Sequence, residues 1–256
     1  MTTEYPIILV HGLMIRHFKR FRAFGHIGKA LKDESYDVYI STHDGFGSIE
    51  TNALQIKNFV MNVLKETGKE KVNIIAHSKG GLDVKHALSD PDFLTRVASL
   101  TTLSTPHKGS VLASAIWKLP MWMKKTAAFF INSFYRIIGD KHPDALKACM
   151  QLREESEYDR SVPSGVLCRS YSARMRRSRD CFVMCIPNQI YKHLAGTEND
   201  GMVTPDSAKF GEYMGDCLDE SLSHAQMVDF LTSKKKRKRV LEFYIKLCLD
   251  LSEMGY

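Results

Sequence analysis

The chain has 256 residues, of which 44% are hydrophobic and 25% charged, as in an ordinary globular protein, and α/β folds commonly reach this length around one core. No apolar run approaches the roughly twenty residues that span a bilayer, so we expect residues 1–256 to form a single domain with an insertion. The net charge of +7 is concentrated in two short clusters, which makes it more informative than its size suggests.

The first hundred residues alternate between strand-like and helix-like segments. Helical segments are predicted to end at 28–33, to cover 52–66 with Gly68 as the C-terminal stop, and to cover 80–89 before Pro91. Buried, β-branched strand segments are predicted at 5–10, 36–40, 72–77 and 97–103. This order predicts an α/β fold with a parallel sheet and helices on both faces.

The segment 72–82, VNIIAHSKGGL, reads as a buried strand that enters a sharp turn at Ser78. Such a turn needs small neighbours, and Ala76 and Gly80 lie two residues on either side of Ser78, while Gly81 allows close packing of the following helix. The pattern is A-x-S-x-G, with alanine at the first small position. By itself this motif also occurs in ordinary strand-to-helix joints, so Ser78 is at this point only a candidate nucleophile.

The alternation stops at about residue 111 and resumes after about residue 160. Met123, Ala127, Phe130, Ile131, Phe134 and Ile138 share one helical stripe, and Lys124, Asn132 and Arg136 lie opposite, with Trp117, Met121 and Trp122 just before. The pattern fits a core helix, a lid over an acyl pocket, or a surface that lies on a lipid interface. We favour the lid, because insertions at the C-terminal edge of a parallel sheet lie over the ligand site.

The last third of the chain completes the sheet. A strand is predicted at 165–171, a further one within 208–218, and an amphipathic terminal helix at 240–251, which gives six strands in all. The six cysteines fit no zinc or disulfide framework, and Cys181 and Cys185 are expected to be free thiols.

The two basic clusters also lie in this part of the chain. They consist of Arg174, Arg176, Arg177 and Arg179, and of the run KKKRKR at 234–239. Such runs can bind nucleic acid or anionic lipid or act as a nuclear address, but a solvated face is the commoner role. No nucleic-acid-binding motif accompanies them, so we expect no nucleic-acid partner, with anionic lipid headgroups as a secondary partner.

A nucleophilic serine needs a histidine to take its proton and a carboxylate to hold that histidine. In serine hydrolases built on such a sheet the acid follows the second strand beyond the nucleophile strand, and the histidine follows the last strand. Of the ten histidines only His224 has that place. The candidate acids are Asp180, Glu198, Asp200 and Asp206. We select Asp200, because Gly201 permits a tight reversal there, and interpret Asp180 as a surface ion pair among arginines.

Ester chemistry also requires N–H donors for the oxyanion. One is expected from Lys79, the residue after the nucleophile, and the other from Leu13 in the loop after the first strand, where Gly12 allows a close approach. His11, His77 and His107 are interpreted as structural, with His77 pointing away from the site.

Four segments in this order and spacing resemble the bacterial true lipases of the α/β-hydrolase superfamily: YPIILVHGL, VNIIAHSKGGLD, LSTPHKGS and GTENDGMVTPDSAKFG. The resemblance covers most of the chain outside the insertion. It implies an α/β-hydrolase fold with a minimal, mostly parallel six-stranded sheet and a helical lid at about 111–160. It also implies a carboxylic ester hydrolase acting on acylglycerols or related esters, with catalytic Ser78, Asp200 and His224 and oxyanion donors Leu13 and Lys79.

The chain departs from the family pattern in three respects. Lys79 replaces the usual glutamine, which would place an ammonium at the pocket. Many relatives hold a structural calcium at positions that match Asp180 and Gln226; the second lacks a charge, so we expect no metal, and no cofactor is implied. The family is mostly secreted, whereas this sequence shows no signal peptide, so we expect a cytoplasmic protein, or a secreted one if a leader has been trimmed.

The leading hypothesis is therefore a lipase or esterase whose substrate is an acyl ester or lipid, with transient contact to a lipid interface or an anionic membrane surface. One alternative is an acyltransferase that uses the same triad. Another is a peripheral lipid-binding protein on a hydrolase scaffold. The sequence does not indicate an oligomeric state.

Overall fold

The computed structural model describes residues 2–13, 23–154 and 161–256. In these residues six parallel strands form one sheet in the order β2-β1-β3-β4-β5-β6. They are β1 (Ile7–Val10), β2 (Val38–Ile40), β3 (Val72–His77), β4 (Val97–Leu103), β5 (Leu167–Ser172) and β6 (Glu212–Asp216). The predicted α/β class and six-stranded parallel sheet are confirmed.

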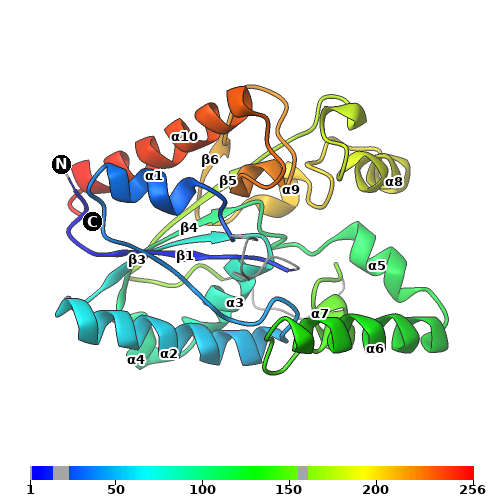
Figure 1. Cartoon of the computed structure of the whole chain (residues 1–256), viewed down its shortest axis with the longest axis horizontal. Coiled ribbons are helices and arrows are strands. Elements are labelled where there is room, and N and C mark those ends of the chain that lie inside the picture. The colour runs from blue at the N-terminus through cyan, green and yellow to red at the C-terminus, as the bar shows by residue number, and fades with distance from the viewer. Residues whose placement is uncertain (1, 14–22, 155–160) are drawn as a thin grey trace.

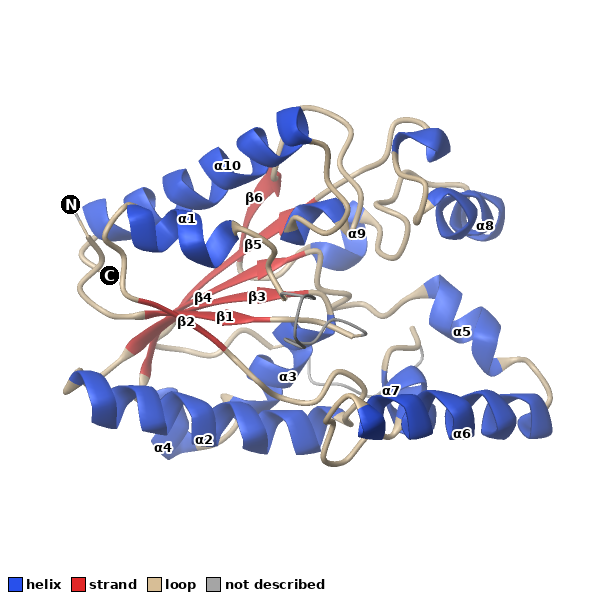
Figure 2. Ribbon diagram, in the orientation of Figure 1, coloured by secondary structure: helices blue, strands red, loops and turns tan. Residues whose placement is uncertain are grey.

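Helices cover both faces of this sheet (Figure 1). On one face lie α1 (Ile27–Asp33) and α10 (Lys234–Glu253), and on the other lie α2 (Ile49–Thr67), α3 (Lys79–Ala87) and α4 (Pro91–Leu94). Beyond the carboxyl ends of the strands lie α5 (Val111–Trp117), α6 (Met121–Ile137), α7 (Ala145–Gln151) and α8 (Cys185–Ala195) (Figure 2). The short elements are α9 (Pro205–Ala208) and the 3-10 turns η1 (Ser178–Asp180) and η2 (Gln226–Val228).

The alternation of side chains along β1 explains the two hydrophobic layers. Ile7 and Leu9 pack in the core under α1 and α10, whereas Ile8 and Val10 pack in the core under α2, α3 and α4. All four side chains are fully buried. A strand covered on both faces therefore reads as a continuous apolar run.

Two of the covering helices begin before their predicted first residues, because a serine caps each of them. The Ser48 side chain accepts a hydrogen bond from the Thr51 N–H at 3.2 Å, so α2 begins at Ile49 rather than at 52. Ser233 likewise accepts from the Lys236 N–H, so α10 begins at Lys234 and includes the basic run. At the other end of α2, Gly68 adopts the left-handed conformation with φ 68°, as its predicted role as C-terminal stop requires.

The insertion between β4 and β5 contains α5, α6 and α7. The buried face of α6 is formed by Ala128 and Tyr135, which pack with Phe46 and Ala145. Phe130 and Phe134 of the predicted apolar stripe are 67% and 56% exposed, so this stripe is not buried as it would be in a core helix. The predicted end of the insertion at residue 160 lies outside the described residues. A lid role for these helices stays a prediction.

All six cysteines are free thiols. Among the described residues, no helix combines the length and the apolar character that crossing a membrane requires.

Candidate active site

Ser78 lies in the turn between β3 and α3, in a backbone conformation that side chains rarely adopt, with φ 57° and ψ −134°. Its N–H donates to the Leu103 carbonyl at 2.9 Å, and its carbonyl accepts from the Thr105 hydroxyl at 2.8 Å. A Cβ at Gly80 would lie 2.3 Å from the His11 carbonyl oxygen. The small residue two positions after Ser78 is therefore required by the close approach of the neighbouring loop.

Three side chains from distant parts of the sequence meet at this turn. The His224 Nε2 lies 2.8 Å from the Ser78 Oγ, and the His224 Nδ1 lies 2.7 Å from the Asp200 Oδ2. The Asp200 side chain is completely buried, and its other oxygen accepts the N–H groups of Met202 and Val203, each at 2.8 Å. The carboxylate is therefore fixed by its own turn and can orient the imidazole toward the serine.

The other acids considered from the sequence do not reach His224. Glu198 forms an ion pair with Arg174 at 2.6 Å, and Asp206 forms one with Lys108 at 2.7 Å. Asp180 accepts hydrogen bonds from the Ser221 hydroxyl and from a backbone N–H. The hydrogen bond with Ser221 is the main cause that lowers the pKa of the Asp180 carboxyl.

Two backbone segments lie beside the serine, the start of α3 and the loop after β1. Lys79 is the first residue of α3, so its N–H has no acceptor within the helix. On the other side, a Cβ at Gly12 would lie 2.5 Å from the Ser78 Cβ and 3.1 Å from its Oγ. The chain segment that leads to Leu13 therefore contacts Ser78 through Gly12, and the role of the Leu13 N–H as the second donor stays a prediction.

The side chain of Lys79 is not at the pocket, which corrects the expectation drawn from the sequence. It is 1% exposed, and its ammonium forms an ion pair with Asp83, one helical turn further along α3, at 2.6 Å. Burial raises the pKa of the Asp83 carboxyl to about 6, although the ammonium acts in the opposite direction. The ammonium therefore serves a buried contact and cannot select a polar substrate.

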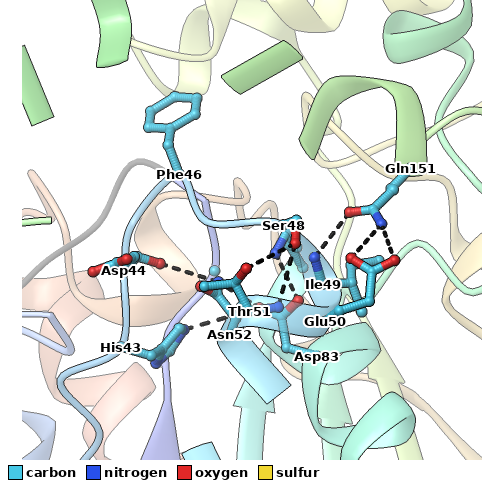
Figure 3. A network of polar contacts seen from close by, with 12 residues as sticks. His43, Asp44, Phe46, Ser48, Ile49, Glu50, Thr51, Asn52, Asp83 and Gln151 are labelled. Carbon is cyan, nitrogen blue, oxygen red and sulfur yellow. Dashed lines mark hydrogen bonds and ion pairs between the residues drawn. The ribbon is translucent and has the colours of Figure 1, made fainter. Parts of the chain in front are cut away.

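This ion pair belongs to a larger buried network, part of which Figure 3 shows. The Asn52 amide donates to Asp83 at 3.0 Å and to the Asp44 carbonyl at 3.1 Å. The His43 Nε2 lies 4.0 Å from the same Asp83 oxygen, Oδ2, and 3.1 Å from the His11 carbonyl oxygen. The network thus connects the helix after the nucleophile with the loop that carries Gly12 and Leu13.

The histidines interpreted as structural are all buried. His11 stacks on His43 with ring centroids 3.8 Å apart, and His107 accepts or donates a hydrogen bond with Thr102 at 3.1 Å. The expectation that His77 points away from the site is wrong. The centroid of its ring lies 4.4 Å from that of the His224 ring. Burial, and then the charge of His224, hold the pKa of His77 well below its ordinary value. A neutral ring therefore packs against His224.

The residues at the family's calcium positions do not fit a calcium ion. The Asp180 carboxylate is held by hydrogen-bond donors, and Gln226 donates its amide to the Asp180 carbonyl at 3.3 Å. The Lys236 ammonium donates to the Ser221 carbonyl at 2.7 Å and lies 3.5 Å from the Gln226 Oε1. A protein cation already lies among these oxygen atoms. The described residues contain no group of three or more His, Cys, Asp or Glu side chains that could hold a metal.

Several known proteins are similar to this chain in sequence. A triacylglycerol lipase of Pseudarthrobacter phenanthrenivorans is 34% identical over 64% of this chain and 56% of its own length. One of Burkholderia plantarii is 34% identical over 64% of this chain and 50% of its own length, so the chain spans about half the length of these two relatives. A triacylglycerol lipase of Pseudomonas fragi is 26% identical over the whole chain and 98% of its own length.

Two solved structures share the fold. The metagenomic carboxyl esterase MGS0156 superposes with a TM-score of 0.71 at 19% identity, covering all of this chain and 76% of that one. Lipase 1 from Pelosinus fermentans gives 0.70 at 15% identity, covering 99% of each chain. The family model of the alpha/beta hydrolase fold matches residues 5–178. The match covers more than half of the chain, which therefore belongs to the alpha/beta hydrolase fold family and is similar within it to triacylglycerol lipases, as the sequence motifs predicted.

Proposed function

We propose that the chain is a serine carboxylic ester hydrolase that cleaves acylglycerols or related acyl esters through an acyl-enzyme. The observation that carries this proposal is the continuous hydrogen-bonded series from the Ser78 Oγ through His224 to the buried Asp200 carboxylate. A serine without a base in contact is a weak nucleophile at neutral pH, and this geometry supplies the base together with the group that orients it.

The reaction runs in two halves. The His224 Nε2 takes the proton of the Ser78 hydroxyl as its oxygen attacks the ester carbonyl, and the imidazolium then gives that proton to the departing alcohol. In the second half His224 takes a proton from water, the resulting hydroxide attacks the acyl-serine, and the acid leaves as Ser78 regains its proton. The N–H groups of Leu13 and Lys79 stabilise the oxyanion in both halves.

The surface beyond the strand ends supports a lipid as the substrate. Large apolar side chains are exposed on α6, among them Trp122, Phe129, Phe130 and Ile137. A soluble domain seldom exposes so many large apolar groups on one helix without a partner for them. We propose that α5 and α6 form a lid whose exposed face contacts a lipid interface while an ester enters the site. The relatives named triacylglycerol lipases support this substrate class.

The test of the activity is the Ser78→Ala variant with p-nitrophenyl esters of different chain length. Loss of ester release in this variant, with unchanged thermal unfolding, supports the proposal, and retained turnover in a clean preparation refutes it. Rates measured below and above the solubility limit of each ester then identify the substrate. A jump above the limit supports opening at an interface, and a smooth preference for short chains indicates an esterase.

Two further outcomes separate the alternatives. If an added alcohol receives the acyl group faster than water does, the chain is an acyltransferase with the same triad. If the wild-type protein binds liposomes but releases no acid from any ester, it is a lipid-binding protein on a hydrolase scaffold.

A further inference from the structure

The two basic clusters, about sixty residues apart in sequence, lie next to one another around Ser221. The backbone N–H of Arg176 donates to the Ser221 hydroxyl at 3.0 Å, and the Lys236 ammonium donates to the Ser221 carbonyl at 2.7 Å. The Arg176 guanidinium also bonds the Asp219 carbonyl. The first turns of α10 and the segment leading into η1 therefore form one surface, which we call the basic surface.

Most cations of the basic surface point into solvent. Its exposed basic residues are Arg176, Arg177, Arg179, Lys234, Lys235, Lys238 and Arg239. The acidic side chains among them are fewer, namely Asp180, Asp219, Glu220 and Glu242. Lys238 lies 3.8 Å from Glu242 in an exposed pair, which screens its charge only weakly. The basic surface therefore carries a net positive charge.

Helix stability does not account for these cations. The first turn of α10 contains only basic residues after Ser233 and no acidic one. Cations at a helix N-terminus face the positive end of the helix dipole, so this arrangement disfavours the helix. Neighbouring cations closer together than the screening length also repel each other. An external anionic partner would offset both the unfavourable helix dipole and the repulsion between the cations, and this relief would favour its binding.

Exposed apolar side chains adjoin the basic surface. The Ser178 hydroxyl donates to the Asn188 side chain at 2.7 Å, which fixes η1 against α8. The turn between them carries Phe182, which is 95% exposed, and α8 presents Ile186 and Ile190 to solvent. In Figure 1 the N-terminal end of α10 lies at the top of the view and α8 at the upper right. Cations beside protruding apolar groups are the features of surfaces that attach to membranes.

From this juxtaposition we propose that the basic surface, with Phe182 and Ile186 beside it, docks onto a bilayer containing anionic phospholipids. The basic residues contact the headgroups, and the apolar side chains enter the acyl boundary. A nucleic acid would satisfy the charges but would leave Phe182 and Ile186 in water, so the apolar groups favour the membrane. This docking goes beyond the proposed ester hydrolysis and rests on separate observations.

Docking here would also orient the site. Ser221 precedes His224 by three residues, and α8 ends five residues before Asp200. The loops that supply the base and the acid therefore start at the basic surface, so attachment to a bilayer brings both loops toward the lipid.

The test uses co-sedimentation with vesicles of phosphatidylcholine alone and of phosphatidylcholine mixed with phosphatidylglycerol. All proteins carry Ser78→Ala, so that hydrolysis cannot change the vesicles. The patch variant combines R177Q, R179Q, K234Q and K235Q, and the matched control removes the same charge elsewhere through K32Q, K65Q, K69Q and K246Q. Lys236 is left intact because it holds the loop at Ser221.

We expect the parent to prefer the anionic vesicles, with binding that weakens as salt is added. Each basic residue near an anionic surface contributes about five-fold, so the patch variant should bind about a hundred-fold or more weakly and the control less than about ten-fold. Phe182→Ser should weaken binding while leaving its salt dependence unchanged. Equal losses in the patch and control variants, no preference for anionic vesicles, or tighter binding to a duplex oligonucleotide would overturn the proposal.

The same substitutions in the catalytically intact chain keep this test separate from the proposed function. The patch variant should hydrolyse a soluble short-chain ester as fast as the wild type. Absence of hydrolysis in the wild type refutes the proposed activity and leaves the vesicle result unaffected.

Discussion

Breaking the buried ion pair between Lys79 and Asp83 should destabilise the protein far more than removing the pair. Both side chains are 1% exposed, and their charged atoms are 2.6 Å apart. Removing one partner of such a pair leaves a buried charge and costs about 3–5 kcal/mol, whereas replacing both partners by apolar residues of similar size is often neutral. We expect Lys79→Met and Asp83→Leu each to lower the free energy of unfolding by about 3–5 kcal/mol.

The double variant K79M/D83L should lose less than about 2 kcal/mol. Urea unfolding of the four proteins at pH 7 gives the coupling energy of the cycle directly. The reasoning is refuted if each single variant loses less than about 1 kcal/mol, or if the loss in the double variant equals the sum of the single losses. Ester hydrolysis by the double variant then shows whether the backbone N–H of residue 79 keeps its place without the ion pair.

The pH dependence of the same comparison tests the burial of Asp83. Burial raises its folded pKa to about 6 from the ordinary value of 3.8, so between these two pH values the folded state holds a proton that the unfolded state has lost. Stability should therefore fall as pH rises from about 4 to about 6, by about 3 kcal/mol from this group. Between pH 4 and pH 7 the free energy of unfolding of the wild type should therefore fall relative to that of K79M/D83L, which lacks the Asp83 carboxyl. A constant difference between the two proteins would contradict the assigned burial.

Three further substitutions test the site and its support. Asp200→Asn should lower kcat by about 10⁴ without unfolding the protein, because the amide favours the wrong imidazole tautomer; a loss below about ten-fold in steady-state kinetics would contradict this. Gly80→Ala should lower the free energy of unfolding by more than about 2 kcal/mol, because its Cβ would lie 2.3 Å from a backbone oxygen of the opposing loop. The control Gly68→Ala, with no atom within 4 Å, should lose only about 1 kcal/mol in thermal unfolding, and equal losses would refute the steric argument. Gln151→Leu should destabilise the insertion by about 1–3 kcal/mol and raise the pKa of Glu50. Burial raises this pKa, but hydrogen bonds from the Gln151 amide, a backbone N–H, Ser48 and Lys147 together lower it to about 2; an unchanged carboxyl titration by NMR would contradict this.

The central strands could be predicted because β1, β3 and β4 are buried on both faces and therefore form mainly apolar segments. Val72–His77 and Val97–Leu103 were assigned to the residue for this reason. The meeting of Ser78, Asp200 and His224 could also be expected, since the carboxyl ends of parallel strands lie at one edge. The apolar pattern of each strand and the order in which the strands follow one another are therefore enough to predict these features.

Contacts between remote segments could not be predicted in the same way. The direction of the Lys79 side chain depends on Asp83, which the spacing KGGLD could have suggested, but also on Asn52 and His43 from other elements. The amphipathic pattern of α6 identified a helix, but the choice of its buried face depends on Phe46 and Ala145 from other segments. Sequence periodicity defines faces without identifying what covers them.

The positive φ of Ser78 bears on how this position can evolve. Its φ of 57° is a conformation that costs a non-glycine residue of the order of 1–3 kcal/mol, and the bonds to Leu103 and Thr105 maintain it. The nucleophile is thus held at the expense of stability. A lineage released from selection for hydrolysis would gain stability by accepting glycine at this position, so retention of serine in a descendant would itself be a record of continued selection on the chemistry.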